Sequence, residues 1–563
     1  MTSPQSLRQW LHARRARGQI STRAQDHAVA SDHKGTVDGG ELLDGLLEGR
    51  VENVALLLGI SLERIEDELT TLGQDVLAIA KDEEGPHRPS FPSLGPEFAG
   101  EHQHAFEDGG LDVGGERVGG LVGEHLALGA QVEHGTACPT GMAYASYAGF
   151  EAEPALSIWA EKVKGIEYEN SRREVAQKPS VVIGYAMTEK QGGSDLRETQ
   201  TTARFSHAED YHGKTAQWYE LTGHKWFCSV PQSDGFFTLA KVNGGVTCFF
   251  LPRTLPDGSY NNFFVQRLKE KAGNKSNASS EVEYAGTLAI RVGEEGRGIR
   301  EILSHAHLTR LDFAIGSAGL MRQCLTLALQ HTTTRKAFGS SIADRPMMTN
   351  VLADMAVEVE AATLLALRVA KATDRMKDCE HEHLLARVAT PAAKFFNCSR
   401  APSIAYESLQ CHGGNGFIEE NPMARLYREA PLNSVWEGAA NMMCVDVRRA
   451  MSRDAHTTDA LFDEVKPLSG QDARFDALVL HAKQLVKNSV EDEFVARPMT
   501  EAVARVLQGA ELMRNSTQDV ADIFLGTRVS NGSGAWGAHY GTLAFTVNQD
   551  KAREVMRRAV VGS

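Results

Sequence analysis

The chain has 563 residues, 42% of them hydrophobic, and a formal net charge of -14 at pH 7. This length exceeds one hydrophobic core, so we expect several domains, and the apolar content excludes overall disorder. The negative charge argues against a surface that binds nucleic acid over its whole extent, although it leaves room for a local basic patch. The eight cysteines lie far apart without a Cys-x-x-Cys pair, which favours a reducing compartment over a disulfide framework or zinc site. No run reaches the length of a membrane span.

The first 127 residues have an irregular composition. Residues 1–25 carry five arginines and no acidic residue, which fits either an organelle transit peptide or a basic surface helix. Beyond them only Val54–Leu77 predicts a helix, and three Gly-Gly pairs recur every five residues near the end of the region. We expect much of 1–127 to be disordered, or its reading frame to depart from the true one.

The chain then becomes regular. An N-terminal helical part at 128–180 is predicted to hold two helices, Gln131–Ala145 and Pro154–Val163. Five short runs rich in β-branched and aromatic residues predict a central β domain at 181–292. These runs are Trp218–Thr222, Phe236–Lys241, Val246–Leu251, Phe263–Leu268 and Val282–Ile290.

Long helical segments follow the β domain. Apolar residues at three- and four-residue spacing predict a helical bundle at 293–454, in which Pro391 should kink its helix or start one. Residues 455–563 are predicted to form a C-terminal helical extension. The bundle helices are expected at Leu311–Thr332, Met347–Ala372, His383–His412 and Asn441–Met451, and extension helices at Ala473–Lys487 and Pro498–Arg514.

One segment, Gly184–Asp195, combines features of a ligand-binding loop. It follows the apolar run 181–183, which predicts a strand, and contains Gly192-Gly193-Ser194, a turn whose N–H groups suit a phosphate. Thr188 supplies a hydroxyl, and Tyr185 with Met187 could flank a flat ring. Taken alone, a strand followed by a glycine-rich loop explains the same residues.

Four further segments place glycines, aromatics and charged groups together. Each has an ordinary structural explanation: a β-hairpin core, a cation at a helix end, a glycine cap and an acid at a helix start. The segments are Gly223–Ser229, Arg335–Gly339, Gln410–Phe417 and Val435–Asn441.

In combination and in this order, the five segments resemble the acyl-CoA dehydrogenase superfamily. The spelling Thr-Glu-Lys-Gln-Gly-Gly-Ser-Asp at 188–195 and the stretch 271–283 resemble its AidB-like, alkylation-response branch. The resemblance runs from about Gln131 to Arg453. It implies a mainly α fold with a central β domain: an N-terminal helical part, a β-barrel middle domain, a C-terminal four-helix bundle and a helical extension.

The resemblance also implies FAD as cofactor and assigns residues to it. Phe227 would pack against the isoalloxazine ring and Ser229 would reach its N5 region. Arg335 and Gln410 would serve the FAD of a neighbouring subunit, which implies a homodimer or homotetramer. The implied cofactor residues are Tyr185, Met187, Thr188, Gly193, Ser194, Phe227, Cys228, Ser229, Arg335, Phe338, Gln410, Gly414, Trp436, Gly438 and Asn441.

Glu437 is the candidate catalytic base. In the family a Glu at this place removes the α-proton of an acyl thioester while the β-hydride passes to the flavin. Trp436 lies beside it, and we expect an apolar surround that raises the pKa of its carboxyl. A helix N-terminal acid is the plain alternative, and some family members carry the base on another helix. Arg310 corresponds to a family arginine near the substrate entrance and is the second candidate catalytic residue.

No metal site is expected. Two His-x-His pairs, His102/His104 and His305/His307, have no Cys or Glu partner at metal-ligand spacing, so we expect solvated or capping histidines.

The sequence therefore predicts an FAD-dependent oxidoreductase that dehydrogenates an acyl-CoA at its α,β bond, with an electron acceptor of unknown identity and no membrane. An AidB-like flavoprotein of the DNA alkylation response that binds DNA, and a flavin-free scaffold, are the alternatives. Residues 455–563 hold 12 Lys and Arg against 14 Asp and Glu, which gives little support for DNA. The compartment is cytoplasmic or, on the basic N-terminus, the mitochondrial matrix.

Overall fold

The computed structural model describes residues 129–165, 169–529, 540–541, 543 and 548–560, and the two short strands β1 (Asp112–Val113) and β2 (Glu116–Arg117), which pair with each other. The chain divides into two units, Phe98–Met556 and the remainder, and the first of these holds nearly all described residues. The expectations for 1–127 fall outside the described residues, apart from β1 and β2.

Two helices precede the β domain. They are α6 (His134–Ala152) and α7 (Ser157–Lys162). The Glu133 carboxylate caps α6 by accepting from the Gly135 N–H at 2.9 Å. Helix α6 packs closely on the barrel because residue 149 is glycine: an added Cβ would lie 2.4 Å from Phe237 and 2.5 Å from His305.

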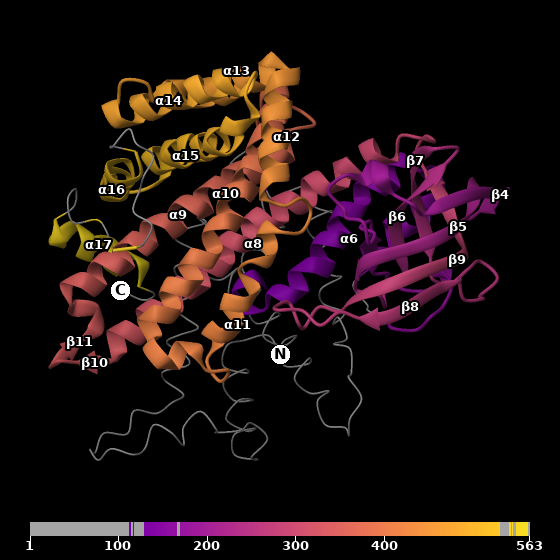
Figure 1. Ribbon diagram of the computed structural model, residues 1–563, viewed down its shortest axis with the longest axis horizontal. Coiled ribbons are helices and arrows are strands. Elements are labelled where there is room, and N and C mark those ends of the chain that lie inside the picture. Colours follow the sequence, from indigo (N-terminus) through magenta and orange to yellow (C-terminus); the bar gives the residue numbers. More distant parts are fainter. Residues whose placement is uncertain are drawn as a thin grey trace, which may run out of the picture. The chain divides into compact units, whose positions relative to one another are not determined.

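The β domain is a closed barrel (Figure 1). Strand β6 pairs with β4 and β7, β4 with β5, β5 with β9, and β9 with β7, while β3 joins β6 and β8 joins β9. The strands are β3 (Ile183–Ala186), β4 (Thr202–Tyr211), β5 (Lys214–Ser229), β6 (Gly235–Val242), β7 (Gly245–Pro252), β8 (Phe263–Leu268) and β9 (Ser279–Val292).

Two differences from the sequence prediction concern strand positions. Strand β4 was not predicted, because its residues are mostly polar and exposed and lack the apolar alternation of the other strands. The apolar run 181–183 enters a strand only at Ile183. The Val181 N–H donates instead to the Lys162 carbonyl at 3.2 Å, which ties it to the end of α7.

Four long helices form the bundle after the barrel, as predicted (Figure 1). Pro391 lies inside a helix rather than at a helix start, and that helix also contains Pro402. The bundle helices are α8 (Gly298–Thr334), α9 (Pro346–Arg375), α10 (Glu380–His412) and α12 (Ala440–Arg453), with the short α11 (Pro422–Glu429) and the two-residue strands β10 (Lys336–Ala337) and β11 (Ser340–Ser341) between them.

The C-terminal extension is helical and is joined to the bundle by buried ion pairs. Arg528 of the extension donates to Asp354 at 2.6 Å and to Glu358 at 3.3 Å, both of which lie on α9. The extension consists of α13 (Ala455–Val465), α14 (Ala473–Ser489), α15 (Ala496–Asn515), α16 (Gln518–Arg528) and α17 (Gln549–Ala559). Within the described residues, no helix has the length and apolarity needed to cross a bilayer.

Candidate active site

The loop after β3 is a tight turn that requires glycine. Gly192 adopts φ 127° and its N–H donates to the Glu189 carbonyl at 3.0 Å. A Cβ added to Gly193 would lie 2.5 Å from Thr188 Oγ1, so this residue approaches the threonine more closely than any side chain permits. At Gly192, by contrast, an added Cβ would meet no atom within 4 Å, which leaves that side of the turn open to a ligand.

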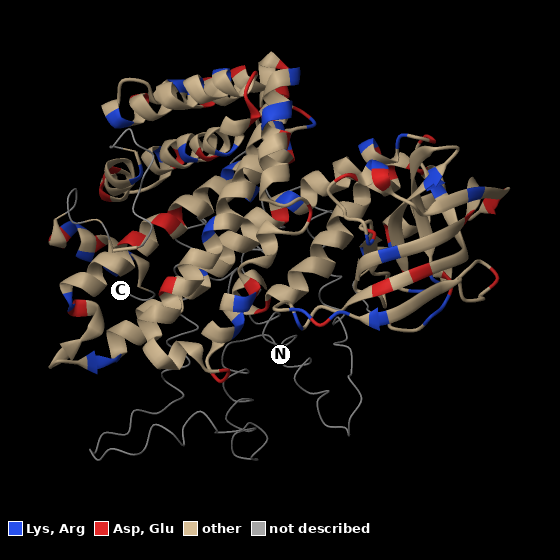
Figure 2. Cartoon of the chain, viewed as in Figure 1, with Lys and Arg blue, Asp and Glu red and all other residues tan. Residues whose placement is uncertain are grey.

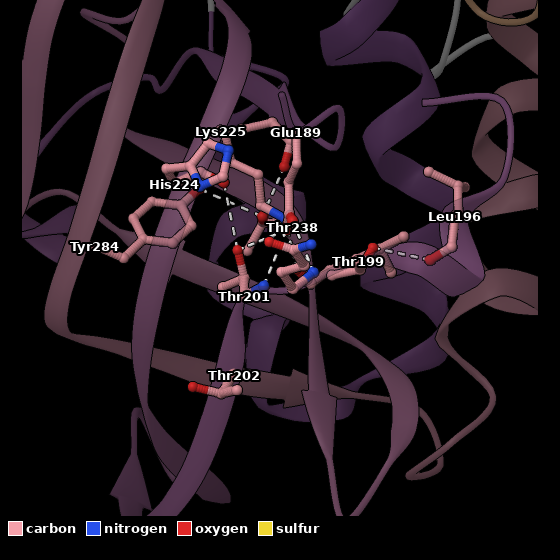
Figure 3. Close-up of polar contacts among 12 residues, drawn as sticks. Glu189, Leu196, Thr199, Thr201, Thr202, His224, Lys225, Thr238 and Tyr284 are labelled. Atoms are coloured by element: carbon pink, nitrogen blue, oxygen red, sulfur yellow. Dashed lines mark hydrogen bonds and ion pairs between the residues drawn. The ribbon is translucent and has the colours of Figure 1, made fainter. Parts of the chain in front are cut away.

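A buried ion pair fixes this loop to the barrel (Figure 3). Lys225 Nζ donates to Glu189 Oε1 and to the Leu239 carbonyl, both at 2.8 Å. Thr201 Oγ1 donates to the same carboxylate oxygen at 2.6 Å. Burial opposes ionisation of Glu189, but Lys225 and the hydrogen bonds outweigh it and hold the pKa of this carboxyl at about 2. The pair therefore fixes the Thr188 turn to strands β5 and β6 of the barrel.

Strand β5 presents an aromatic and a hydroxyl beside the turn. The Trp226 N–H donates to the Thr188 carbonyl at 2.7 Å, which joins the first two motif segments. Phe227 is 47% exposed and Ser229 is partly exposed, whereas Cys228 points into the barrel core. Phe227 and Ser229 are therefore available to a ligand, and the Cys228 side chain is not.

The turn that carries Glu437 is held by two cations. Glu437 adopts φ 53°, and Gly438 follows with φ 104°. Arg310 Nε donates to the Glu437 carbonyl at 3.1 Å, and its NH1 donates to Asp446 at 2.8 Å. Lys394 Nζ donates to the carbonyls on either side, those of Trp436 and Gly438, at 2.6 Å each. Three successive carbonyls of this turn thus accept from positively charged groups.

Trp436 is fixed on both its ring and its nitrogen. The indole stacks on Phe313 of α8 with ring centroids 4.6 Å apart, and its Nε1 donates to Asn433 Oδ1 at 3.1 Å. Asn433 in turn lies within hydrogen-bond distance of His134 on α6 and donates to Ser317 on α8 at 3.0 Å. The turn is thus tied to both helices.

Two buried groups on α6 and α8 have raised pKa values to which the Glu437 charge contributes. Burial raises the pKa of Cys138 to about 11, hydrogen bonds with Asn277 and Ser229 oppose this rise, and Glu437 adds to it. Burial also raises the pKa of Asp312 to about 8, and the Glu437 charge contributes.

The expected apolar surround of Glu437 is wrong for this chain. Its side chain is exposed, and the nearest charged groups are Lys394 and Arg310. The aromatic neighbour Trp436 turns toward Phe313 instead of covering the carboxylate.

The structure places the other predicted residues apart from this centre or in packing roles. Tyr185 packs against Phe237 and bonds His305 Nδ1 through its hydroxyl at 2.7 Å, and Met187 packs beside the same core. Ser194 is exposed, and Asn441 accepts from Arg497 at 2.8 Å.

A second group of predicted residues lies at the opposite end of the bundle. Arg335 ends α8, and Gln410 lies in the last turn of α10, where His331 and His412 stack with centroids 4.7 Å apart. Arg335 and Gln410 are exposed, as are Phe338 and Gly414. Arg335 follows Arg310 by 25 residues on α8, a separation of about 37 Å at helical rise.

The prediction of solvated histidines is wrong for His305, which is 1% exposed, because α6 and the barrel cover that face of α8. His307 is only partly exposed and lies near Arg310 and Asp446. The first His-x-His pair falls outside the described residues. Within the described part, no three His, Cys, Asp or Glu side chains are grouped to hold a metal ion.

Sequence reasoning missed Lys394 and Asp312. Each is a charged residue type within a stretch of apolar helix, at Thr-Pro-Ala-Ala-Lys-Phe-Phe and Thr-Arg-Leu-Asp-Phe-Ala-Ile. Such residues are seldom buried unless they are paired or functional, and that was the available signal.

Comparisons with known proteins agree with this geometry. Residues 184–287 match the family description "Acyl-CoA dehydrogenase, middle domain" and residues 296–452 match "Acyl-CoA dehydrogenase, C-terminal domain". AidB of Escherichia coli K12, which carries an acyl-CoA dehydrogenase name, is 40% identical over 396 residues, covering 70% of this chain and 71% of AidB. The chain is an AidB-like member of the acyl-CoA dehydrogenase superfamily. It is thus an oxidoreductase of the acyl-CoA dehydrogenase type, as predicted.

More distant relatives of this AidB-like protein share parts of the chain and the fold. Acyl-CoA dehydrogenase family member 11 of Caenorhabditis elegans is 28% identical over 59% of this chain and 58% of its own length. The crystal structure of Caenorhabditis elegans ACDH-11 in complex with C11-CoA has a TM-score of 0.70 at 22% identity, covering 89% of this chain and 93% of that one. An acyl-CoA dehydrogenase complexed with FAD from Bacillus anthracis has a TM-score of 0.60 at 18% identity, covering 88% and 94%. These structures establish the fold.

Proposed function

We propose that this AidB-like protein is an FAD-dependent acyl-CoA dehydrogenase in which Glu437 removes the α-proton of an acyl thioester. The proposal rests on one observation: Arg310 and Lys394 hold the turn on which Glu437 lies exposed, in a chain that belongs to the acyl-CoA dehydrogenase superfamily. The predicted flavin-contacting residues Phe227 and Ser229 lie together beside the Thr188 turn.

The residues at this place fit FAD. Phe227 offers an exposed aromatic face, Ser229 and Thr188 offer hydroxyls, and the backbone of Gly192 is open on one side. Such glycine turns accommodate phosphate groups, and exposed aromatics stack on flat rings. FAD, when bound, supplies the acceptor for the β-hydride. Glu437, whose turn is held by Arg310 and Lys394, is left to accept the α-proton.

The complete site needs a second subunit. Arg335 lies about 37 Å along α8 from Arg310, which holds the Glu437 turn, and Gln410 lies in the last turn of α10 at the same end of the bundle as Arg335. A neighbouring copy is therefore the source of these two groups for each FAD. Exposure of Phe338 at 94% fits a side chain that is covered only in an oligomer.

The substrate class is an acyl-CoA thioester. The structural neighbours include an ACDH-11 complex with C11-CoA and a glutaryl-CoA dehydrogenase complex with glutaryl-CoA.

DNA binding is not the function that the extension supports. Figure 2 draws basic and acidic residues interspersed along the C-terminal helices. Several cations there are already paired: Arg474 with Asp472, Arg514 with Glu464, and Lys551 with Asp519. A phosphate backbone would have to displace these carboxylates.

The test is anaerobic titration of the flavin-loaded protein with acyl-CoAs of increasing chain length. Bleaching of the flavin absorbance by at least one thioester is expected, and Glu437→Gln should slow it by about 10²–10⁴-fold while retaining bound FAD. Glu420→Gln, which changes an exposed acid in the connection between α10 and α11, serves as the control and should react like the native chain. Full-rate reduction in Glu437→Gln, or no reduction of the native flavin by any thioester, would overturn the proposal.

A further inference from the structure

Lys394 is a buried lysine whose ammonium group contacts no carboxylate among the described residues. Its side chain is 1% exposed within α10, and among the described residues no carboxylate lies at ion-pair distance from it. Instead its Nζ donates to two carbonyls, those of Trp436 and Gly438, at 2.6 Å each. Burying an ammonium group in this way is costly, and an apolar residue of the same size would pack at that place without the penalty.

The two carbonyls belong to the residues before and after Glu437, the proposed catalytic base. Glu437 lies between them in the left-handed region, at φ 53°, a conformation that non-glycine residues rarely adopt. Arg310 Nε holds the carbonyl of Glu437 itself from the opposite helix, α8. Lys394 from α10 and Arg310 from α8 therefore clamp the same turn from two sides.

We propose that Lys394 is a positioning residue that holds the Glu437 turn in its left-handed conformation. The inference rests on the proposed function and adds to it a residue that does not touch the substrate. Strain at a reactive residue persists only where surrounding contacts over-determine it, and two short charge-assisted hydrogen bonds meet that need.

The geometric and electrostatic parts of this role are separable. A lysine amine that has lost its proton still carries two N–H groups, enough for both carbonyls, but no charge. Burial lowers the pKa of Lys394 to about 8, Cys398 and Glu437 oppose this shift, and Arg310 reinforces it. Glu437 and Arg310 are the charged groups that face the ammonium from the turn and from α8, and Cys398 faces it from one turn along α10.

Two variants with side chains close to lysine in size, measured in the flavin-loaded protein, separate the effect of the hydrogen bonds from the effect of the charge. Lys394→Gln keeps two N–H donors and removes the charge, whereas Lys394→Met removes both. The rate of flavin reduction by the best acyl-CoA should fall about 100-fold in Lys394→Met, because a misplaced base loses its alignment, and by less than about tenfold in Lys394→Gln.

A second buried lysine provides the matched control. Lys178 is also nearly inaccessible, and its Nζ donates to the Ser171 carbonyl at 3.1 Å and to Asp234 at 2.5 Å, away from the Glu437 turn. Lys178→Met should lower stability and leave the rate of flavin reduction near native. If Lys394→Met behaves like Lys178→Met, losing stability alone with a near-native rate, the positioning role is wrong.

Failure of the proposed function is distinguished from failure of this inference by hydrogen exchange. Amides of residues 435–441 should exchange at least tenfold faster in Lys394→Met than in Lys178→Met, whether or not any thioester reduces the flavin. Equal exchange in the two variants would overturn the clamp. A native chain that no thioester reduces, but that shows the exchange difference, would overturn the proposed dehydrogenation and leave the clamp in place.

Discussion

Lys225 and Glu189 form a fully buried ion pair, 2.8 Å between Nζ and Oε1, that connects strand β5 to the turn after β3. The lysine side chain is 0% exposed and the glutamate side chain 1%. Because the Thr188 turn and the Phe227 strand both depend on it, this pair supports two of the surfaces assigned to the flavin. Its value lies in fixing a geometry, since a buried ion pair seldom adds much net stability.

Breaking that pair on one side should destabilise the protein and release the cofactor. Lys225→Met leaves the Glu189 carboxylate buried and uncompensated, a loss of about 3–5 kcal/mol in the free energy of unfolding. Chemical denaturation and the flavin-to-protein absorbance ratio measure the two effects. As a control, Arg204→Gln breaks the exposed pair with Glu220 on neighbouring strands of the same barrel, and both readouts should stay near native. Native flavin content in Lys225→Met would contradict the anchoring role.

The buried Asp312 carboxyl should make the stability of the protein fall as the pH rises. Burial raises its folded pKa from 3.8 to about 8, so its contribution is fully present below pH 4 and is lost as the pH rises toward 8. Asp312→Asn cannot ionise and avoids this loss. The stability of the variant relative to the native chain should therefore increase from pH 5 to pH 8, at up to about 1.4 kcal/mol per pH unit.

Denaturant midpoints at pH 5, 6.5 and 8 test this prediction. Asp446→Asn is the control, because burial opposes the ionisation of Asp446 but Arg387 and Arg310 outweigh that effect and lower its pKa. Its variant should be less stable than the native chain by an amount that stays constant from pH 5 to pH 8, because a carboxyl with a lowered pKa takes up its proton only in stronger acid. A constant difference between Asp312→Asn and the native chain across this range would show that Asp312 is ionised throughout.

The fold was largely predictable because helical and strand periodicities are local properties of the chain. The long bundle helices and five barrel strands follow from apolar spacing alone, but β4 does not, since its polar faces are exposed and its pairing with β5 is a tertiary property. Glycine-rich turns were equally visible, and Gly192 and Gly413 do take positive φ.

The contacts that hold the Glu437 turn could not be predicted from the local sequence pattern. Lys394 is 42 residues from Trp436 and Arg310 is 127 residues from Glu437, so only packing of the bundle reveals that they hold one turn. The exposure of Glu437 was mispredicted for the same reason. The direction of the Trp436 ring depends on Phe313, which lies on another helix.

The two glycine turns should respond differently to a single methyl group. Gly193→Ala forces a Cβ to within 2.5 Å of Thr188 Oγ1, so the turn must open and flavin content should fall severalfold. Gly414→Ala adds a Cβ with no atom within 4 Å, so the subunit should fold with native stability. Thermal unfolding and bound flavin distinguish the two. Loss of subunit stability in Gly414→Ala would mean that this turn is packed within its own chain.

Mixing two inactive variants tests whether each site uses two chains. Gly193→Ala damages the turn in its own chain, and Arg335→Gln damages the group assigned to the neighbour's FAD. In a mixed dimer one site combines the intact turn of one chain with the intact Arg335 of the other, while the second site carries both lesions. Co-refolding equal amounts should therefore restore about a quarter of the native rate, because about half of the dimers are mixed and each has one intact site. Gly193→Ala mixed with Lys225→Met should restore nothing, since both lesions lie in the same half of the site. If the first mixture also stays inactive while mixed dimers are detected by mass spectrometry, Arg335 serves the FAD of its own chain or none, and the distance along α8 must be bridged in another way.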